Sequence, residues 1–265
     1  MKFKKNYKFK KENYFFWVSR SKKKERLVCT NDKYLDLLEE DQIIKKIKNN
    51  RTILEIGCGN GILLKRLKKK VKFKEYFGTD FVSELINQSN HKYKNFKNIS
   101  FQQKDMTEIN KNSFNKKYDY VISKRAIQNI LNSNLQLKVI DNLGYYLKKN
   151  GMMILVESSS TAQKNINIFR KKYKLSKIIP PFHNLFFDDN KVIKYKYKNL
   201  KLDKIENFSS NYYFISRVIN AMLCKDFLNK TPKYNDPLNQ IGLIINDNLL
   251  NKDFSQIKTY IFKKK

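Results

Sequence analysis

The feature that most constrains the fold is a cluster of glycines near residue 60. Gly57, Gly59 and Gly61 lie within five residues, although the chain of 265 residues contains only seven glycines. The cluster follows a short apolar run, residues 52–56, and precedes a segment, 62–69, whose pattern is typical of a helix. Glycine in such a unit permits a tight turn and a close approach of backbone to a ligand. The sequence therefore predicts a buried strand that ends at a ligand-binding turn.

The alternation of strand and helix continues beyond this unit. Further strands are expected over residues 75–79, 99–103, 118–123 and 152–156, with helices between them, one of which runs to Lys149. Residues 201–208 and 258–262 are expected to be two more strands. Strands that alternate with helices form a mostly parallel sheet covered on both faces. We therefore predict an α/β fold with about seven strands.

The chain is expected to contain one α/β domain with additions at both ends. Residues 1–50 are interpreted as an N-terminal helical collar, made of a basic, aromatic lead-in and an amphipathic helix over 32–48. Residues 51–158 form the core of the domain. Residues 159–265 supply the last strands and a cap insert, largely helical over 211–228, above the substrate.

The glycine cluster can be compared with two nucleotide-binding patterns. The nicotinamide fingerprint G-x-G-x-x-G would need a glycine at position 62, where the chain has Ile62. The observed run E-x-G-x-G-x-G, from Glu55 to Gly61 within ILEIGCGNG, resembles motif I of the class I S-adenosylmethionine-dependent methyltransferases. The resemblance covers roughly residues 50–158. It implies a Rossmann-like fold and S-adenosylmethionine as the cofactor.

The resemblance also implies the cofactor's contacts. An acid at the position of Asp80 takes both ribose hydroxyls, and a carboxylate offers two acceptor oxygens for this role. Asp105 lies where the family places an acid near the adenine amino group, and Met106 where it places an apolar residue near the ring. Asp119 is expected to be structural. The expected cofactor residues are Glu55, Gly57, Cys58, Gly59, Gly61, Asp80, Phe81, Asp105, Met106 and Ser123.

Electrostatics agrees with this assignment. The cofactor carries a sulfonium and an ammonium group, and the chain has a net charge of +32, so local carboxylates are needed to hold it. Glu55, Asp80 and Asp105 all lie at or beside the carboxyl ends of predicted strands. Ligands of open α/β sheets bind at that edge.

Methyl transfer is an in-line displacement that needs proximity, and a general base only where the nucleophile carries a proton. His183, in the turn P-P-F-H-N after the fifth strand, is the candidate base, with Asp188 or Asp189 to orient it. A partly buried loop histidine without a catalytic role is the alternative.

Arg125, directly after the fourth strand, is the second catalytic candidate. Its guanidinium would hold a carboxylate or phosphate of the acceptor, or would pair with Glu157, and the residues leave both options open. Tyr212, Tyr213 and Arg217 in the insert are candidates to line the cap, although packing between helices is the preferred interpretation for the two tyrosines.

Three functions are considered. The first is O-methylation of a sugar or other small polar acceptor, because three segments, including Pro181 to Asn184, resemble bacterial methyltransferases of surface glycans and small metabolites. The second is methylation of RNA, with the lysine-rich surface as the binding face, although lysines spread along the whole chain also agree with biased composition. The third is a binding protein without catalysis, which the intact glycine motif disfavours. Base N-methylation is disfavoured because Ser123 to Ala126 do not form the Asn/Asp-Pro-Pro-aromatic motif.

Composition limits the remaining options. The sequence contains no run of about 18 or more apolar residues, so no membrane span is expected. The basic N-terminus lacks the pattern of a secretory signal, and a cytoplasmic protein is expected. Cys29, Cys58 and Cys224 are widely spaced, which predicts neither disulfides nor a metal site.

Overall fold

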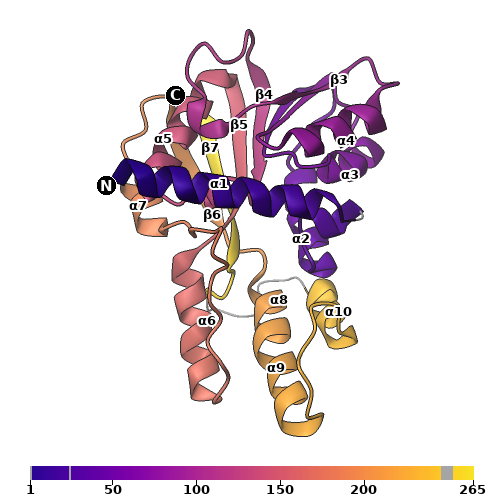
Figure 1. Cartoon of the computed structure of the whole chain (residues 1–265), viewed down its shortest axis with the longest axis vertical. Coiled ribbons are helices and arrows are strands. Elements are labelled where there is room, and N and C mark those ends of the chain that lie inside the picture. Colours follow the sequence, from indigo (N-terminus) through magenta and orange to yellow (C-terminus); the bar gives the residue numbers. More distant parts are fainter. Residues whose placement is uncertain (1, 24, 246–252) are drawn as a thin grey trace.

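Seven strands form one sheet within the residues that the computed structural model describes, which are 2–23, 25–245 and 253–265 (Figure 1). The strands are β1 (Thr52–Ile56), β2 (Glu75–Asp80), β3 (Ile99–Gln103), β4 (Tyr118–Lys124), β5 (Leu147–Ser158), β6 (Leu200–Glu206) and β7 (Ile257–Lys264). Their spatial order is β3-β2-β1-β4-β5-β7-β6. Strands β1 to β5 pair in parallel, and β7 is antiparallel to both β5 and β6. The predicted Rossmann-like α/β fold is confirmed.

Helices cover both faces of this sheet because successive residues of the central strand point to opposite sides. All five residues of β1 are buried; Ile53 packs into one apolar cluster and Leu54 into the other. The first cluster contains side chains of α2 (Lys33–Ile44) and α3 (Ile62–Lys70), and the second those of α5 (Ser133–Leu143). Helix α4 (Ser83–Tyr93) packs beside β2 and β3.

The N-terminal lead-in forms a helix, α1 (Lys2–Ser21), which crosses the front of the molecule in Figure 1. Its side chains bond to residues that follow three different strands. Lys10 reaches Asp105 after β3, and Asn13 donates to the carbonyl oxygen of Asn129 after β4. The hydroxyl of Tyr14 donates to Glu84 after β2. Helix α1 therefore lies across the carboxyl edge of the sheet, where the ligand was expected.

The part of the chain after β5 is mainly helical. It contains α6 (Ser160–Lys172), α7 (Asp189–Lys194), α8 (Ser210–Phe214), the π-helix η5 (Ile215–Ile219), α9 (Asn220–Met222), the π-helix η6 (Leu223–Phe227) and α10 (Pro237–Ile244). Short 3-10 turns, η1 (Glu25–Val28), η2 (Met106–Glu108), η3 (Ile127–Asn129) and η4 (Gly144–Tyr146), lie between the other elements. Helices α6, α9 and α10 extend below the sheet in Figure 1. The helical insert predicted over 211–228 is present.

Two element boundaries were predicted wrongly. The helix expected to run to Lys149 ends at Leu143, and β5 begins at Leu147 rather than at Met152. The pairing of β5 with β4 shifts between Tyr118 and Tyr120, and Asn150 has a φ of 66°. An irregular strand of this kind does not show the regular alternation on which strand prediction depends.

Asp119 has the structural role that was predicted. Its Oδ2 accepts hydrogen bonds from the backbone N–H and the hydroxyl of Thr52, each at 2.8 Å, and an ion pair from Lys148 at 2.9 Å. It therefore joins the starts of β1 and β4.

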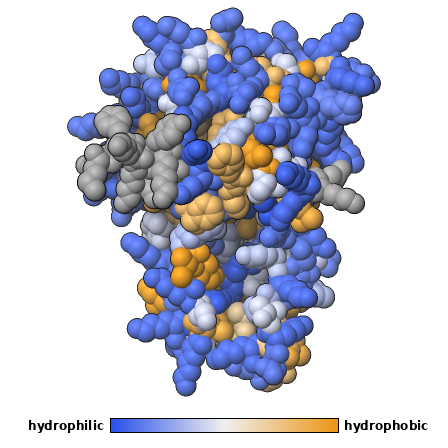
Figure 2. Space-filling model, in the orientation of Figure 1, coloured by the Kyte–Doolittle hydropathy of each residue, from blue (hydrophilic) through white to orange (hydrophobic). Residues whose placement is uncertain are grey.

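The face in Figure 2 is largely hydrophilic, with hydrophobic side chains gathered mainly in its middle and toward its lower end. The apolar middle is near the level at which α1 crosses the sheet. No helix among the described residues is both long enough and apolar enough to cross a membrane.

Candidate active site

The turn after β1 has a backbone that only glycine adopts easily. Gly57, Gly59 and Gly61 have φ angles of 70°, 54° and 68°, in the left-handed region. A Cβ added at Gly57 would lie 2.1 Å from the Cβ of Ala126, which leaves no room for a side chain. The amides of Gly57 and Cys58 both donate to the carbonyl oxygen of Thr79, at 2.7 and 2.9 Å. The turn is therefore tied to β2 and held close to the loop after β4.

Asp80, at the end of β2, is fixed by the same turn. The amide of Gly59 donates to its Oδ2 at 2.9 Å, and the amide of Val82 donates to its Oδ1 at 3.0 Å. Burial raises the pKa of Asp80 to about 6. Its carboxylate has the two acceptor oxygens that the predicted contact with two ribose hydroxyls requires.

Glu55 provides a second buried carboxyl group behind the turn. It accepts a hydrogen bond of 2.5 Å from the hydroxyl of Tyr76, and burial raises its pKa to about 7. A cation bound beside it would favour its ionised form. Glu55 is thus suited to the cationic end of the cofactor.

These residues surround one cavity of about 70 Å³. Seven of the ten predicted cofactor residues line it: Glu55, Gly57, Cys58, Gly59, Asp80, Phe81 and Met106. The other wall includes Trp17 and Cys29 from the N-terminal segment, which sequence reasoning missed, and Lys124 at the end of β4, which was expected on the acceptor side. We call this space the cofactor cavity.

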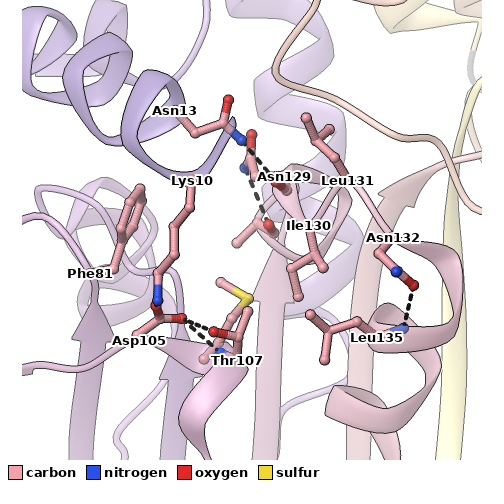
Figure 3. Close-up of a pocket in the computed structure, with 12 residues that line it drawn as sticks. Lys10, Asn13, Phe81, Asp105, Thr107, Asn129, Ile130, Leu131, Asn132 and Leu135 are labelled. Carbon is pink, nitrogen blue, oxygen red and sulfur yellow. Dashed lines mark hydrogen bonds and ion pairs between the residues drawn. The ribbon is translucent and has the colours of Figure 1, made fainter. Parts of the chain in front are cut away.

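A second pocket of about 170 Å³ adjoins the cofactor cavity and shares Phe81 and Met106 with it (Figure 3). Its walls are mainly apolar, with Ile130 and Leu135 on the side of α5. At its rim Asp105 accepts from Lys10 at 2.5 Å. The shape and chemistry suit a flat ring with an amino group, which is the role predicted for Asp105 and Met106.

Ser123 and Gly61 line none of these cavities. Gly61 is the N-cap residue of α3, whereas the fully buried hydroxyl of Ser123 donates to Glu157 at 2.9 Å. Ser123 therefore positions Glu157, and its side chain does not reach the cavity at which it was expected. A residue near the end of a buried strand can point to either face of the sheet. The position of Ser123 in the sequence therefore did not show whether its hydroxyl faces the cavity or Glu157.

Glu157 does not pair with Arg125, so that alternative is also wrong. Its carboxylate accepts from the backbone amides of Ala126, Ile127 and Gln128, at 3.2, 3.0 and 3.2 Å. These bonds fix the turn after β4, and the acceptor oxygens of Glu157 are occupied by backbone amides.

Arg125 instead faces α2. Its Nε lies 3.1 Å from Glu39, and its Nη2 lies 3.6 Å from Asp36, which also pairs with the buried Lys124 at 2.6 Å. Arg125 has a φ of 53°, and a left-handed residue other than glycine costs about 1–3 kcal/mol, a strain that is concentrated at functional sites. Sequence analysis read α2 only as an amphipathic helix and missed its fully buried acids, Asp36, Glu39 and Glu40.

A larger cavity of about 310 Å³ adjoins the cofactor cavity and shares Trp17, Cys29 and Arg125 with it. We call it the acceptor chamber. Its walls come from α1, from the loop over 178–186 and from the segment at Tyr213 and Arg217. The chamber is therefore assembled from distant parts of the chain, beside the place where the cofactor was expected.

His183 lines the acceptor chamber, as a catalytic base would require. Its ring stacks on Phe16 with centroids 4.0 Å apart and meets Trp17 edge-on at 5.7 Å. Its Nδ1 is buried and has no hydrogen-bond partner among the described residues. Burial, and then the charge of Arg20, lower the pKa of His183 to about 4, so the ring is neutral at pH 7.

The prediction that Asp188 or Asp189 orients His183 is wrong. Asp188 caps α7 and accepts from the amides of Asn190 and Lys191. Asp189 is buried and bonds to Ser159, Lys258 and Tyr260. Aromatic rings hold the imidazole instead. No group of three His, Cys, Asp or Glu residues in the described part of the chain is placed to hold a metal ion.

Of the three candidates in the insert, Tyr212 is fully buried in the apolar core and does not line the chamber. Tyr213 and Arg217 line the chamber, and Arg217 also packs through an ion pair of 2.5 Å with Asp32. Phe16, Trp17 and Arg20 of α1 were missed altogether. The cluster of aromatic residues in the lead-in was the one signal for them, because such residues usually need a packing partner.

Comparisons with known proteins agree with this site. The family described as "Methyltransferase domain" matches residues 47–200. Malonyl-acyl-carrier-protein O-methyltransferase 2 of Ilyobacter polytropus is 29% identical over 168 residues, 62% of this chain and 60% of that protein. Ribosomal RNA small subunit methyltransferase A of Prochlorococcus marinus (strain MIT 9301) is 36% identical over 87 residues, 33% of this chain and 31% of that protein. The chain thus spans between about a third and three fifths of these relatives.

Among solved structures, N-methyltransferase NodS from Bradyrhizobium japonicum WM9, in complex with S-adenosyl-L-homocysteine, has a TM-score of 0.58 at 10% identity. The match covers 95% of this chain and 98% of that one, and it shows a shared fold. The family match covers more than half of the chain, and the motif residues line one cavity. The chain therefore belongs to the class I S-adenosylmethionine-dependent methyltransferases, and its cofactor is S-adenosylmethionine.

Proposed function

We propose that this methyltransferase methylates a hydroxyl group of a sugar or another small polar molecule bound in the acceptor chamber. The chamber itself carries the proposal. Its volume of about 310 Å³ is within the range of small-molecule sites, about 300–1,000 Å³. It adjoins the cofactor cavity, so an acceptor inside it would be next to the donor.

The chain's residues would act mainly by holding the two reactants in line. The cofactor supplies an activated methyl group on its sulfonium. Asp80 and Glu55 would hold the cofactor's ribose and its cationic end. The walls of the chamber from α1 and the loop over 178–186 would orient the acceptor and exclude water.

His183 would accept the proton that a hydroxyl acceptor loses. Its lowered pKa of about 4 keeps the ring neutral at pH 7, with a nitrogen lone pair free to accept. The same low pKa makes it a weak base, so we expect a contribution near the lower end of the usual range, about 10²-fold. The stacking on Phe16 would fix the direction of the ring.

Methylation of RNA is the second candidate, because the chain has a net charge of +32 and matches a ribosomal RNA methyltransferase over 87 residues. A nucleotide of RNA would have to reach the donor past α1, which crosses the carboxyl edge of the sheet. The bonds of Lys10, Asn13 and Tyr14 hold α1 against that edge.

The test uses S-adenosylmethionine labelled in its methyl group, incubated with the full chain and fractionated extract of its host. Each fraction is counted before and after nuclease treatment, with the Asp80→Ala variant as the control without cofactor binding. Label in a nuclease-resistant small-molecule or glycan fraction would support the proposal. Label that disappears with nuclease would replace it with the RNA function.

A further inference from the structure

Three arginines from distant parts of the chain meet at the acceptor chamber: Arg20 of α1, Arg125 after β4 and Arg217 of η5. Two of them face carboxylates. Arg217 pairs with Asp32 at 2.5 Å, and Arg125 pairs with Glu39 at 3.1 Å. The charge of Arg217 is therefore compensated inside the protein, whereas that of Arg125 is compensated only in part, since its Nη2 has no hydrogen-bond partner.

Arg20 differs because its hydrogen bonds go to uncharged oxygens. Its Nε donates to the carbonyl oxygen of Val28 at 2.9 Å, and its Nη2 donates to that of Leu27. Its Nη1 lies 3.4 Å from the amide oxygen of Asn31. No carboxylate among the described residues forms an ion pair with Arg20. Its positive charge faces the chamber uncompensated.

The neighbours of Arg20 increase the positive potential at this point. Burial, and then repulsion from Arg125, lower the pKa of Arg20. Arg125 itself has a buried Nη2 without a hydrogen-bond partner and holds Thr30 through its Nη1 at 3.4 Å. Like charges that share a cavity are costly, and a bound anion would relieve this cost.

We propose that the acceptor carries an anionic group, a carboxylate or a phosphate, which is bound between Arg20 and Arg125. This inference rests on the proposed function, since it names the class of small molecule that the chamber takes. Guanidinium groups bind both kinds of anion through paired, charge-assisted hydrogen bonds. Arg125 also lines the cofactor cavity, so an acceptor held there lies beside the donor.

The aromatic walls complete the description of this acceptor. Phe16 and Trp17 of α1 and Tyr234, close to α10 in the chain, line the chamber. Flat apolar faces of this kind pack against a sugar ring or an aromatic ring. The acceptor is therefore expected to combine a ring with one acidic group, and its methylated hydroxyl would point toward His183.

The experiment measures anion binding rather than turnover. The full chain is saturated with S-adenosylhomocysteine and titrated in a calorimeter with benzoate or with inorganic phosphate. We expect at least one probe to bind, with an affinity that falls at least about tenfold in Arg20→Gln. The probe that binds distinguishes a carboxylate from a phosphate acceptor.

Two variants make the result specific. Arg51→Gln removes the same charge from a half-exposed side chain that pairs with Asp119, far from the chamber lining, and should leave binding unchanged. Arg20→Lys keeps the charge and should restore part of the binding. S-adenosylhomocysteine affinity is measured for every variant, because Arg20 also holds the backbone at Val28.

Three results would overturn the inference. The first is that neither probe binds, and the second is that Arg20→Gln and Arg51→Gln bind the probe equally well. The third is that Arg20→Gln weakens the binding of S-adenosylhomocysteine itself, which would make Arg20 a contact of the cofactor's carboxylate. Its failure can be told from failure of the proposed function: label in a neutral small molecule would overturn the anionic acceptor alone, whereas nuclease-sensitive label would overturn the function.

Discussion

The cofactor cavity and the acceptor chamber adjoin each other, but the chain builds them in different ways. The polar contacts expected for the cofactor come from three consecutive strand ends, between Glu55 and Asp105. The chamber takes its walls from Phe16 at one end of the chain to Ile257 at the other. The first site depends on local geometry at the edge of a sheet, and the second depends on how distant segments pack.

This difference explains what can change in each site. A turn with three left-handed glycines and an acid fixed by its amides tolerates few substitutions, because the backbone itself forms the site. The chamber is made of side chains on α1, a loop and a π-helical segment, so single substitutions can alter it while the sheet persists. Proteins with this fold can thus bind the same methyl donor while their methyl acceptors differ.

The largest effect should come from breaking the cofactor site at Gly57. In Gly57→Ala the new Cβ would meet that of Ala126 at 2.1 Å, and the residue would keep an unfavourable φ of 70°. We expect S-adenosylmethionine to bind at least about 100-fold more weakly by calorimetry, close to 3 kcal/mol.

A matched pair of variants separates the clash from the strained backbone. The double variant Gly57→Ala, Ala126→Gly removes the clash and should recover part of the affinity. Gly59→Ala has a milder contact, 3.2 Å from the sulfur of Cys29, and should lose less. Equal losses in all three proteins would show that the close approach to Ala126 is unimportant.

A smaller effect, confined to turnover, is expected on the acceptor side. His183→Gln should lower kcat by about 100-fold for a hydroxyl acceptor, because the proton acceptor is lost. Affinity for S-adenosylmethionine should not change, since His183 lines only the acceptor chamber. Near-full turnover of the variant at pH 7 would refute its role as the base.

The pH dependence of cofactor binding tests the buried acids. The ionised form of Asp80 would accept both ribose hydroxyls, and burial raises its pKa to about 6 before the cofactor binds. Affinity should therefore be full above this pH and fall as the pH drops through 6, reaching about tenfold weaker at pH 5. Glu55, with a pKa of about 7, adds a further loss of affinity that begins at higher pH, as the pH drops through 7. Calorimetry from pH 5 to pH 8 measures this curve.

The control is Asp80→Asn, which should bind weakly and lack the part of the curve near pH 6. A wild-type affinity that stays constant from pH 5 to pH 8 would contradict the role of these carboxyl groups.

The smallest effect is expected where the two sites are joined by α1. Lys10 is half exposed and pairs with Asp105, and exposed ion pairs contribute about 0–1 kcal/mol. Lys10→Met frees Asp105 for the adenine amino group, so we expect affinity for S-adenosylmethionine to rise by no more than about threefold. A clear loss of affinity would mean that Lys10 helps to hold the cofactor.

The same comparison explains how far the sequence could predict this protein. Short-range patterns predicted the sheet. The resemblance of the segment from Glu55 to Gly61 to a family motif, with Asp80 at the end of the next strand, predicted residues that line the cofactor cavity. Ser123 does not line the cavity, because the side to which a buried residue points depends on its partner, here Glu157. The boundary near Lys149 failed because the strand is irregular there.

The acceptor chamber could be predicted only in fragments. His183 and Arg125 were found as isolated polar residues, but their partners on α1 and α2 are between about 86 and 167 residues away in the chain. The pairing of Arg125 with the buried Glu39 depends on how α2 packs against the end of β4. Such contacts leave no spacing pattern in a single sequence.

The most direct test of the account is a crystal structure of the full chain with S-adenosylhomocysteine. We expect the adenine between Met106 and Leu135, the ribose at Asp80, and the sulfur facing the acceptor chamber beside Arg125. A sulfur atom that faces open surface, with the chamber closed off from it, would contradict the proposed small-molecule acceptor.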